Sequence, residues 1–150
     1  MRLLGHAHRS LDSKGRLMLT PEFRDQFLAA SPDGRLVLTI YQGQIIGITP
    51  AQWDIFAAEL ETKLTSPSPM LQDVRRVAFA GYSEVVLDKQ GRIQLPTHLR
   101  KSGRLGADVV LVGVGRCFEI WDKDRFEALL EQRNEDVSAE MAKADIKLPF

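Results

Sequence analysis

The chain contains one sequence unit written twice. The segment LDSKGRLMLTPEFR, which begins at Leu11, aligns with LDKQGRIQLPTHLR, which begins at Leu87. Both segments join a Leu-Asp pair, a Gly-Arg pair, alternating apolar residues, a proline and a final arginine. Because two like units in one chain can bury their apolar faces against each other, this repeat constrains the fold more than any other feature.

The spacing between the two copies is almost constant. Asp12 and Asp88 are 76 residues apart, whereas Pro21 and Pro96 are 75 residues apart. We therefore expect one residue to be inserted in the first copy, at Thr20.

Each copy predicts a strand, a turn and a second strand, followed by a short helix, two more strands and a longer helix. The fold class that follows is α+β, with two pseudo-symmetric repeats of β-hairpin and helix that share a core. The later strands are expected at 36–40, 46–48, 109–112 and 118–120. The expected organisation is a first repeat at 1–64, a linker and connecting helix at 65–80, a second repeat at 81–142 and a tail at 143–150.

Capping residues mark the ends of the short helices. Thr20 is a suitable N-cap with Pro21 in the first helical position. Pro96 is expected to open the matching helix, and Gly103 to end it.

The longer helices are recognised by apolar residues spaced about 3.6 apart. This spacing predicts closing helices over 53–64 and 126–141, and the segment from Met70 to Ala80 predicts a connecting helix. Prolines and serines just before Met70 break the chain between the copies.

The turn in each copy suits a tight hairpin. The Asp12 side chain can accept hydrogen bonds from the backbone ahead of it, and Gly15 supplies a positive φ. Because strand residues alternate between faces, Arg16 leaves the turn on the face opposite Leu17 and Leu19. The second copy repeats this arrangement with Asp88, Gly91 and Arg92.

Charge is unevenly distributed along the 150-residue chain, although 20 basic residues balance 20 acidic ones. Residues 1–16 carry a net charge of +3, residues 75–104 carry +5 and residues 116–150 carry −3. A zero total therefore does not argue against a nucleic-acid partner, because attraction depends on where the charge lies.

Composition excludes several protein classes. The single cysteine excludes a disulfide scaffold and a thiolate zinc site, and it fits a reducing cytosol. No apolar run approaches the roughly 18–20 residues that span a bilayer. His6 and His8 have metal-like spacing but no third ligand nearby. With no Ser/His/Asp arrangement and no phosphate-binding loop, we expect no cofactor, no metal and no enzymatic activity.

The duplicated arginines have two interpretations. A two-stranded ribbon fits the major groove of DNA, where Arg16 and Arg92 can each bind a guanine through two hydrogen bonds. Alternatively, each arginine only closes its turn by an ion pair with Asp12 or Asp88. Turn chemistry alone does not separate them, but the recurrence of the whole pattern favours the first.

This ordered set of motifs resembles the MraZ family of bacterial transcriptional regulators, which contain two domains of the SpoVT–AbrB swapped-hairpin type. The resemblance runs from the first strand to about Met141. It includes the Leu11–Arg16 motif, the Arg75-Arg76 helix leading to Gly81-Tyr82-Ser83-Glu84, the Leu111–Gly113 segment and the Phe118–Asp122 segment.

The resemblance implies a sequence-specific DNA-binding regulator, usually a repressor of the division and cell-wall gene cluster that includes its own promoter. Such a protein binds short direct repeats in double-stranded DNA as a ring-shaped homo-oligomer. It works in the bacterial cytoplasm at the nucleoid, with no membrane partner and no small-molecule substrate.

The resemblance also assigns roles by position. The expected DNA-binding residues are Arg16, Lys14, Arg92 and Lys89. The residues expected to shape the loops are Asp12, Gly15, Asp88 and Gly91. Arg24 and Arg100 are secondary DNA contacts or structural residues. Gln90 stands where the first copy has Lys14, so the two loops are not expected to contact DNA phosphates equally.

Two functions of other classes stay open. One is a ring-forming scaffold whose acidic helices bind another protein. The other is an enzyme that uses Asp–Arg pairs in clefts between copies. A measurement of salt-dependent DNA binding distinguishes the DNA-binding regulator from the scaffold, because only the regulator is expected to bind DNA.

Overall fold

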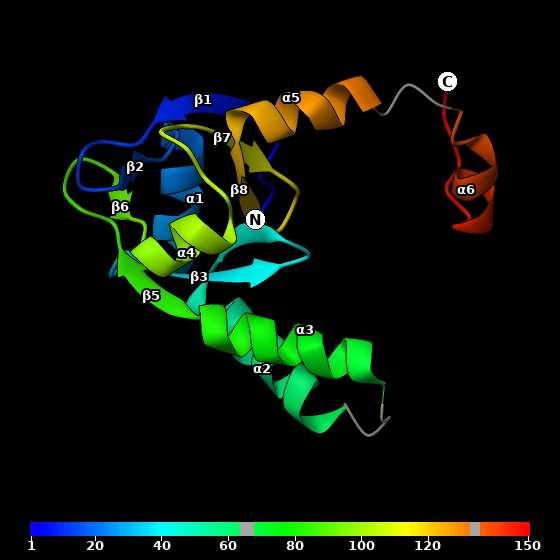
Figure 1. Ribbon diagram of the computed structural model, residues 1–150, viewed down its shortest axis with the longest axis horizontal. Helices are drawn as coiled ribbons and strands as arrows, with labels where there is room; N and C mark the ends of the chain where they lie inside the picture. The colour runs from blue at the N-terminus through cyan, green and yellow to red at the C-terminus, as the bar shows by residue number, and fades with distance from the viewer. Residues whose placement is uncertain (64–67, 133–135) are drawn as a thin grey trace.

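The computed structural model describes residues 1–63, 68–132 and 136–150 (Figure 1). Leu64 at the end of the expected first closing helix and residues 65–67 of the expected linker lie outside these ranges.

A six-stranded antiparallel sheet forms the centre of the molecule. A separate ribbon of two antiparallel strands lies beside it. Across the sheet the strands are β1 (His6–Ser10), β7 (Asp108–Gly113), β8 (Phe118–Asp122), β4 (Gln44–Ile48), β3 (Arg35–Tyr41) and β5 (Ser83–Val86). The ribbon consists of β2 (Arg16–Met18) and β6 (Arg92–Gln94).

The sheet order is symmetric with respect to the two repeats. Reading β1-β7-β8-β4-β3-β5 from the other edge gives the same order once β1 is exchanged for β5, β3 for β7 and β4 for β8. Strands of both repeats are therefore interleaved in one sheet, and the expected α+β fold with a shared core is confirmed.

The simple hairpin that local turn chemistry predicted within each copy does not form; the strands exchange partners between the repeats, as the resemblance to the swapped-hairpin type implied. The strands on either side of the first turn, β1 and β2, pair with β7 and β6 of the second repeat and not with each other. In the same way β5 pairs with β3. The reversal at each turn is present, but the strands that follow the turns are exchanged between repeats because β2 and β6 bury Leu17 and Ile93 together.

The short helices are α1 (Pro21–Ala30) and α4 (Thr97–Ser102). The Thr20 hydroxyl accepts a hydrogen bond from the Phe23 amide, as a helix N-cap does. Pro96 is the N-cap of α4 and not its first helical residue. Thr20 and Pro96 are thus equivalent positions, 76 residues apart, and the insertion expected at Thr20 is not needed.

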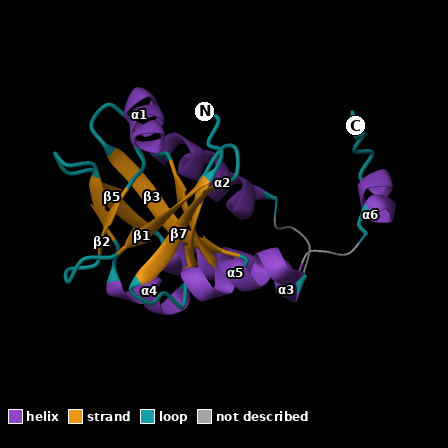
Figure 2. Ribbon diagram, turned by 90° about the horizontal axis from the view of Figure 1, so that it is seen from above, coloured by secondary structure: helices purple, strands orange, loops and turns teal. Residues whose placement is uncertain are grey.

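The remaining helices are α2 (Pro50–Thr62), α3 (Pro69–Gly81), α5 (Lys123–Gln132) and α6 (Ser138–Lys143). Helix α3 confirms the connecting helix with one more residue at each end. The single helix expected over 126–141 was wrong, because residues 136–137 are not helical and α6 begins only at Ser138; residues 133–135 of that prediction lie outside the described ranges. Helix α6 stands apart from the rest of the molecule (Figures 1 and 2).

Alternation along the strands divides the core in two. The ribbon, α1 and α4 cover one face of the sheet with buried residues such as Leu17, Phe23 and Leu99. On the other face, Trp53 of α2 packs against strand residues, and α3 is docked by the Thr39 hydroxyl, which donates to the Ala78 carbonyl at 2.5 Å. Figure 2 shows the strands gathered between helices.

Candidate nucleic-acid interface

The β2–β6 ribbon has one buried and one outward face. In its register, Arg16 lies opposite Gln94, Leu17 opposite Ile93, and Met18 opposite Arg92. Leu17 and Ile93 are buried in the core, whereas Met18 and Gln94 are exposed. Arg16 and Arg92 are diagonal neighbours on the outward face, where such positions are about 7–8 Å apart. The predicted orientation of both arginines is confirmed.

The first turn is held by a single carboxylate. The Oδ1 atom of Asp12 accepts the backbone amides of Lys14 at 2.9 Å and Arg16 at 2.8 Å. Its Oδ2 atom accepts the Arg16 Nε at 2.6 Å. The Gly15 amide donates to the Asp12 carbonyl at 2.9 Å, and Gly15 has a φ of +76°. These bonds fix both the turn and the direction of the arginine.

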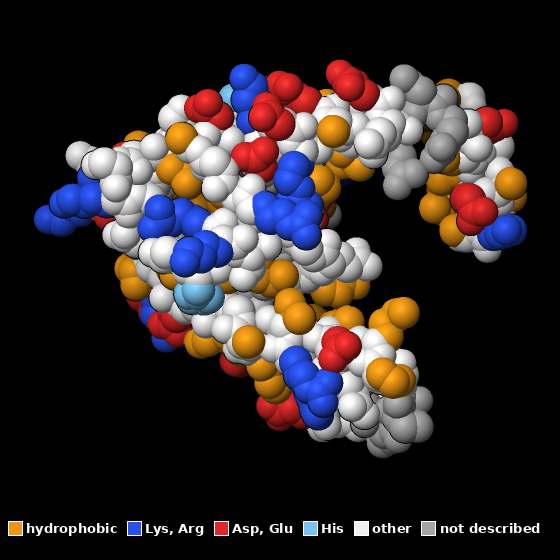
Figure 3. Space-filling view, viewed as in Figure 1, with side chains coloured by type: hydrophobic (Ala, Val, Ile, Leu, Met, Phe, Trp, Pro, Cys, Tyr) orange, Lys and Arg blue, Asp and Glu red, His pale blue; other side chains and the backbone are white. Residues whose placement is uncertain are grey.

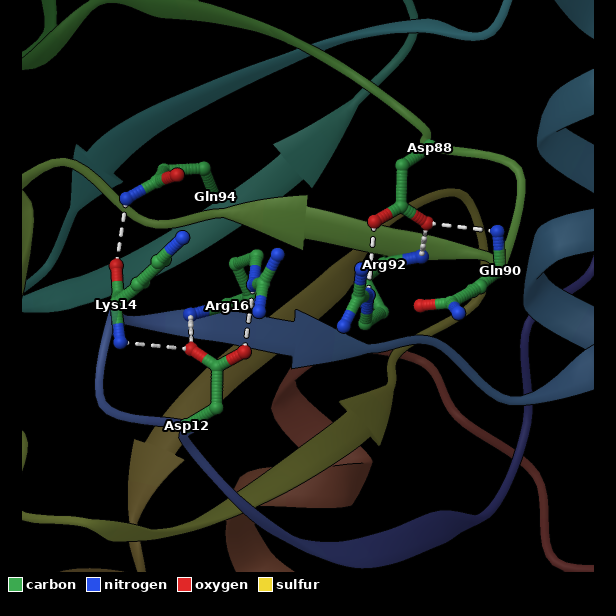
Figure 4. A network of polar contacts seen from close by, with 7 residues as sticks. All are labelled: Asp12, Lys14, Arg16, Asp88, Gln90, Arg92 and Gln94. Carbon is green, nitrogen blue, oxygen red and sulfur yellow. Dashed lines mark hydrogen bonds and ion pairs between the residues drawn. The ribbon is translucent and has the colours of Figure 1, made fainter.

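The second turn repeats this pattern (Figure 4). The Oδ1 atom of Asp88 accepts the amides of Gln90 and Arg92, both at 2.9 Å, and Oδ2 accepts the Arg92 Nε at 2.8 Å. Gly91 has a φ of +82°. The structure therefore places two equivalent Asp–Arg turns at opposite ends of one ribbon.

The ion pairs expected from the alternative interpretation are present, but they use only part of the hydrogen-bonding capacity of each arginine. Each carboxylate takes only the Nε of its arginine. Among the residues that the structure describes, no partner accepts from the terminal nitrogens of Arg16 or Arg92. A guanidinium held through Nε keeps its two terminal nitrogens available for a bidentate acceptor such as a guanine edge or a phosphate.

These hydrogen bonds also lower the pKa of the two carboxyl groups. The Arg16 backbone amide, together with the Arg16 guanidinium and the Lys14 amide, lowers the pKa of Asp12 to about 2. The corresponding Arg92 and Gln90 groups lower the pKa of Asp88. Both carboxylates are therefore charged at neutral pH.

The depressed pKa predicts that the first turn persists in acid. Because the folded pKa of Asp12 lies below its unfolded value of about 3.9, its contribution is complete above about pH 4 and is lost as pH falls through about 2. We expect the Asp12 carboxyl carbon to titrate near pH 2 in NMR spectra. In Arg16→Ala the midpoint should rise only in part, because the backbone amides remain. A midpoint near 3.9 in the native chain would contradict this geometry.

Arg24 and Arg100 contact the turns of the opposite repeat. A Cβ atom at Gly15 would lie 2.9 Å from the Arg100 Cζ, and one at Gly91 would lie 3.2 Å from the Arg24 Cδ. Backbone hydrogen bonds also join each turn to the other repeat. The Leu95 amide donates to the Gly15 carbonyl at 2.9 Å, and the Leu19 amide donates to the Gly91 carbonyl at 3.1 Å. The sequence left the role of both arginines open, and these contacts place each side chain against the turn of the other repeat.

The lysines lie at the exposed tips of the turns. Lys14 precedes Gly15, and Lys89 follows Asp88; both side chains are exposed. Figure 3 shows Lys and Arg side chains over the end of the molecule that carries the ribbon and α4, whereas Asp and Glu gather along α5. The uneven charge of the sequence thus becomes a basic end and an acidic helix.

Sequence reasoning missed two residues of this surface. Gln94 donates through Nε2 to the Lys14 carbonyl at 2.5 Å, and the Arg9 Nε donates to the Met18 carbonyl at 3.1 Å. Alternation already placed Gln94 on the arginine face of its strand. Its contact with the first turn became visible only with the pairing of β2 and β6.

Other kinds of site are missing from the described part of the chain. The His6 and His8 rings are neighbours, with centroids 5.7 Å apart. Within residues 1–63, 68–132 and 136–150, however, no three His, Cys, Asp or Glu side chains gather as metal ligands. None of the helices in these ranges has the length and apolar character to cross a membrane.

Comparison with known proteins relates this architecture to one family. The chain is 57% identical to the transcriptional regulator MraZ of Maridesulfovibrio salexigens over the full length of both proteins. The chain belongs to the MraZ family. It is also 44% identical to the MraZ regulator of Nitratidesulfovibrio vulgaris over 97% of each chain, and 34% identical to that of Ligilactobacillus salivarius over 95% of this chain and 99% of the other.

The MraZ family model, described as "MraZ protein, putative antitoxin-like", matches residues 78–148. This range contains the second turn, β6 and α4, whereas the whole-chain MraZ relatives also cover the first turn. The resemblance inferred from the repeated motif is thereby confirmed. The relatives bear the name of transcriptional regulators.

Proposed function

We propose that the chain is a sequence-specific DNA-binding transcriptional regulator whose outward ribbon face reads DNA. The observation that carries the proposal is the pair of equivalent Asp–Arg turns on one ribbon. Each turn holds an arginine through Nε and leaves its terminal nitrogens to an external acceptor. The relatives' name as transcriptional regulators supports the same function.

The dimensions and chemistry of the ribbon suit the major groove. A two-stranded ribbon enters this groove, and arginine is the residue that most often binds guanine O6 and N7 together. In this proposal Arg16 and Arg92 contact bases, while Lys14 and Lys89 contact phosphates and thereby set affinity and salt dependence. Arg24 and Arg100 support the turns from the opposite repeat.

The proposed regulatory role follows from the family. We propose a repressor of the division and cell-wall gene cluster, including its own promoter, that binds short direct repeats and works at the nucleoid in the cytoplasm. The proposal includes no catalytic step and no cofactor.

The proposal also includes assembly into a ring of identical chains. Helix α3 supports it, because Met70 and Val77 are exposed on α3 at 76% and 47%. Both side chains line one surface groove with Ile40 and Tyr41, and a contiguous exposed apolar surface is typical of sites that bind another protein. Ile55 of α2, 66% exposed, adds to the apolar surface of these two helices.

Charged substitutions on this surface are expected to lower the oligomer mass. In Met70→Glu with Val77→Glu, two carboxylates replace apolar side chains that a second copy would bury, and burial of unpaired charge is costly. Sedimentation velocity measures the result, with Arg76→Glu, which lies on the same helix and pairs with Asp73, as the charge control. An unchanged mass would place the ring contact elsewhere.

The proposed function is tested by fluorescence anisotropy on the chain's own upstream DNA, with a scrambled duplex as control, at several salt concentrations. We expect preference for the native fragment and a linear fall of log affinity with log salt, with a slope near −0.9 for each phosphate neutralised. Equal binding to both duplexes would indicate a basic surface without sequence readout. Binding to neither would favour the scaffold.

A further inference from the structure

We infer that the two DNA-reading turns are unequal, that the first turn makes the dominant specific contact, and that Gln94 of the second repeat is its positioning residue. This inference rests on the proposed function and extends it to the division of work between the repeats.

The first observation is a side-chain bond that only one turn has. The Gln94 Nε2 donates to the Lys14 carbonyl at 2.5 Å, which ties the tip of the first turn to the neighbouring strand (Figure 4). The bond spans from β6 of the second repeat to a loop of the first. It therefore adds to the bonds that Asp12 already makes within its own turn.

The symmetric position in the second turn cannot make this bond. Met18 is the counterpart of Gln94, since it lies opposite Arg92 as Gln94 lies opposite Arg16. A thioether has no hydrogen to donate. Among the described residues, no side chain donates to the carbonyl of Gln90, the counterpart of Lys14.

Arg100 and Arg24, which contact the two turns, also differ, and the closer contact is again at the first turn. The guanidinium of Arg100 lies against Gly15, with Cζ and Nε at 2.9 and 3.0 Å from the place of a Cβ atom. Arg24 instead approaches Gly91 through its aliphatic Cδ, at 3.2 Å, and its Nε donates to Asp25 at 3.0 Å. The Arg24 Nη1 atom is farther from the place of a Cβ atom, at 3.9 Å, so the guanidinium group packs more closely on the glycine of the first turn than on that of the second.

The first turn is held by more contacts before DNA binds, and this favours it as the dominant specific contact. A loop that is already held in one conformation loses less conformational freedom on binding, so more of its contact energy appears as affinity. The first turn also carries its lysine beside the glycine, whereas the second carries Gln90 there. Arg16 should therefore contribute more to specific binding than Arg92.

The inference is tested by comparing Arg16→Ala with Arg92→Ala and Gln94→Met with Met18→Leu on the native DNA fragment. We expect the larger loss from Arg16→Ala. Gln94→Met should lower specific affinity by about three- to tenfold, in proportion to one hydrogen bond. Its salt slope should stay unchanged, because no phosphate contact is removed. Met18→Leu, the matched control, should stay within roughly twofold of the parent.

Amide hydrogen exchange supplies a readout without DNA. The Lys14 amide should exchange more slowly than the Gln90 amide, and Gln94→Met should reduce this difference. Met18→Gln should slow exchange in the second turn by supplying the missing donor. Equal exchange in the parent chain, or no effect of Gln94→Met, overturns the positioning role.

The DNA measurements separate two failures. Equal losses from Arg16→Ala and Arg92→Ala would overturn the dominance of the first turn while leaving the proposed function intact. If neither substitution weakens specific binding, the proposed function fails together with that dominance, and the exchange data still decide whether Gln94 orders the turn.

Discussion

The double variant Arg16→Ala, Arg92→Ala is expected to lose about two to three orders of magnitude in affinity for the native DNA fragment, because each bidentate arginine–guanine contact contributes about 1–3 kcal/mol. Both guanidinium groups lie on one face of the ribbon and are held through Nε by Asp12 and Asp88. Alanine removes the reading group and leaves the turn bonds to the backbone in place. The protein should therefore stay folded while it loses binding.

Two controls give this result its meaning. Lysine at both positions keeps the charge but not the planar fork of donors, so it should retain binding to scrambled DNA and lose the preference for the native fragment. Arg76→Ala removes a basic residue from α3, where Arg76 pairs with Asp73 at 2.8 Å, and should leave specific binding unchanged. Native affinity in the double alanine variant, with intact circular dichroism, would exclude the ribbon arginines as the readers.

The second large effect is expected in the core. Phe118 is fully buried at the start of β8, and its ring packs against Phe23 and Phe27 of α1 with centroids 6.2 and 5.4 Å apart. Phe118→Ala should lower the free energy of unfolding by about 3–5 kcal/mol, since it removes a large side chain and leaves a cavity. Urea denaturation measures the loss. Phe150→Ala, at a position 98% exposed, is the control and should have little effect.

Gly47 makes the same site testable from the other side. It pairs with Phe118 across β4 and β8, and a Cβ atom there would lie 2.1 Å from the Phe118 Cζ, a severe clash. Gly47→Ala should therefore destabilise the chain strongly by itself but add little to Phe118→Ala, where the space is free. Additive losses would show that the two positions do not share this space.

Local chemistry made much of this structure predictable. The Asp–Gly turns, the Thr20 cap and the outward arginines follow from residues within a few positions of each other, and the structure has all of them. The predicted insertion at Thr20 arose because Pro21 was aligned with Pro96 by residue type. In the structure Thr20 and Pro96 are both N-caps, so these two positions are equivalent.

Strand partners were less predictable. Strands β2 and β6 have only three residues each, so their alternation defines a buried face but not the partner that completes it. Alternation alone therefore does not give the exchange of partners, which only the resemblance to the swapped-hairpin type implied, and the contact of Gln94 with Lys14 was not predicted. The break before α6 was missed because the apolar spacing was followed past Asp136, whose carboxylate accepts the Ser138 amide just before the helix.

The exchange of strands also determines when the sheet and the ribbon can be completed during translation. The first turn emerges from the ribosome early, but its ribbon partner is residue 92–94 and the partner of β1 is residue 108–113. A nascent chain that holds only the first repeat therefore has unpaired strands and no completed ribbon. A prematurely stopped chain therefore ends without the completed β2–β6 ribbon, the surface that we propose reads DNA.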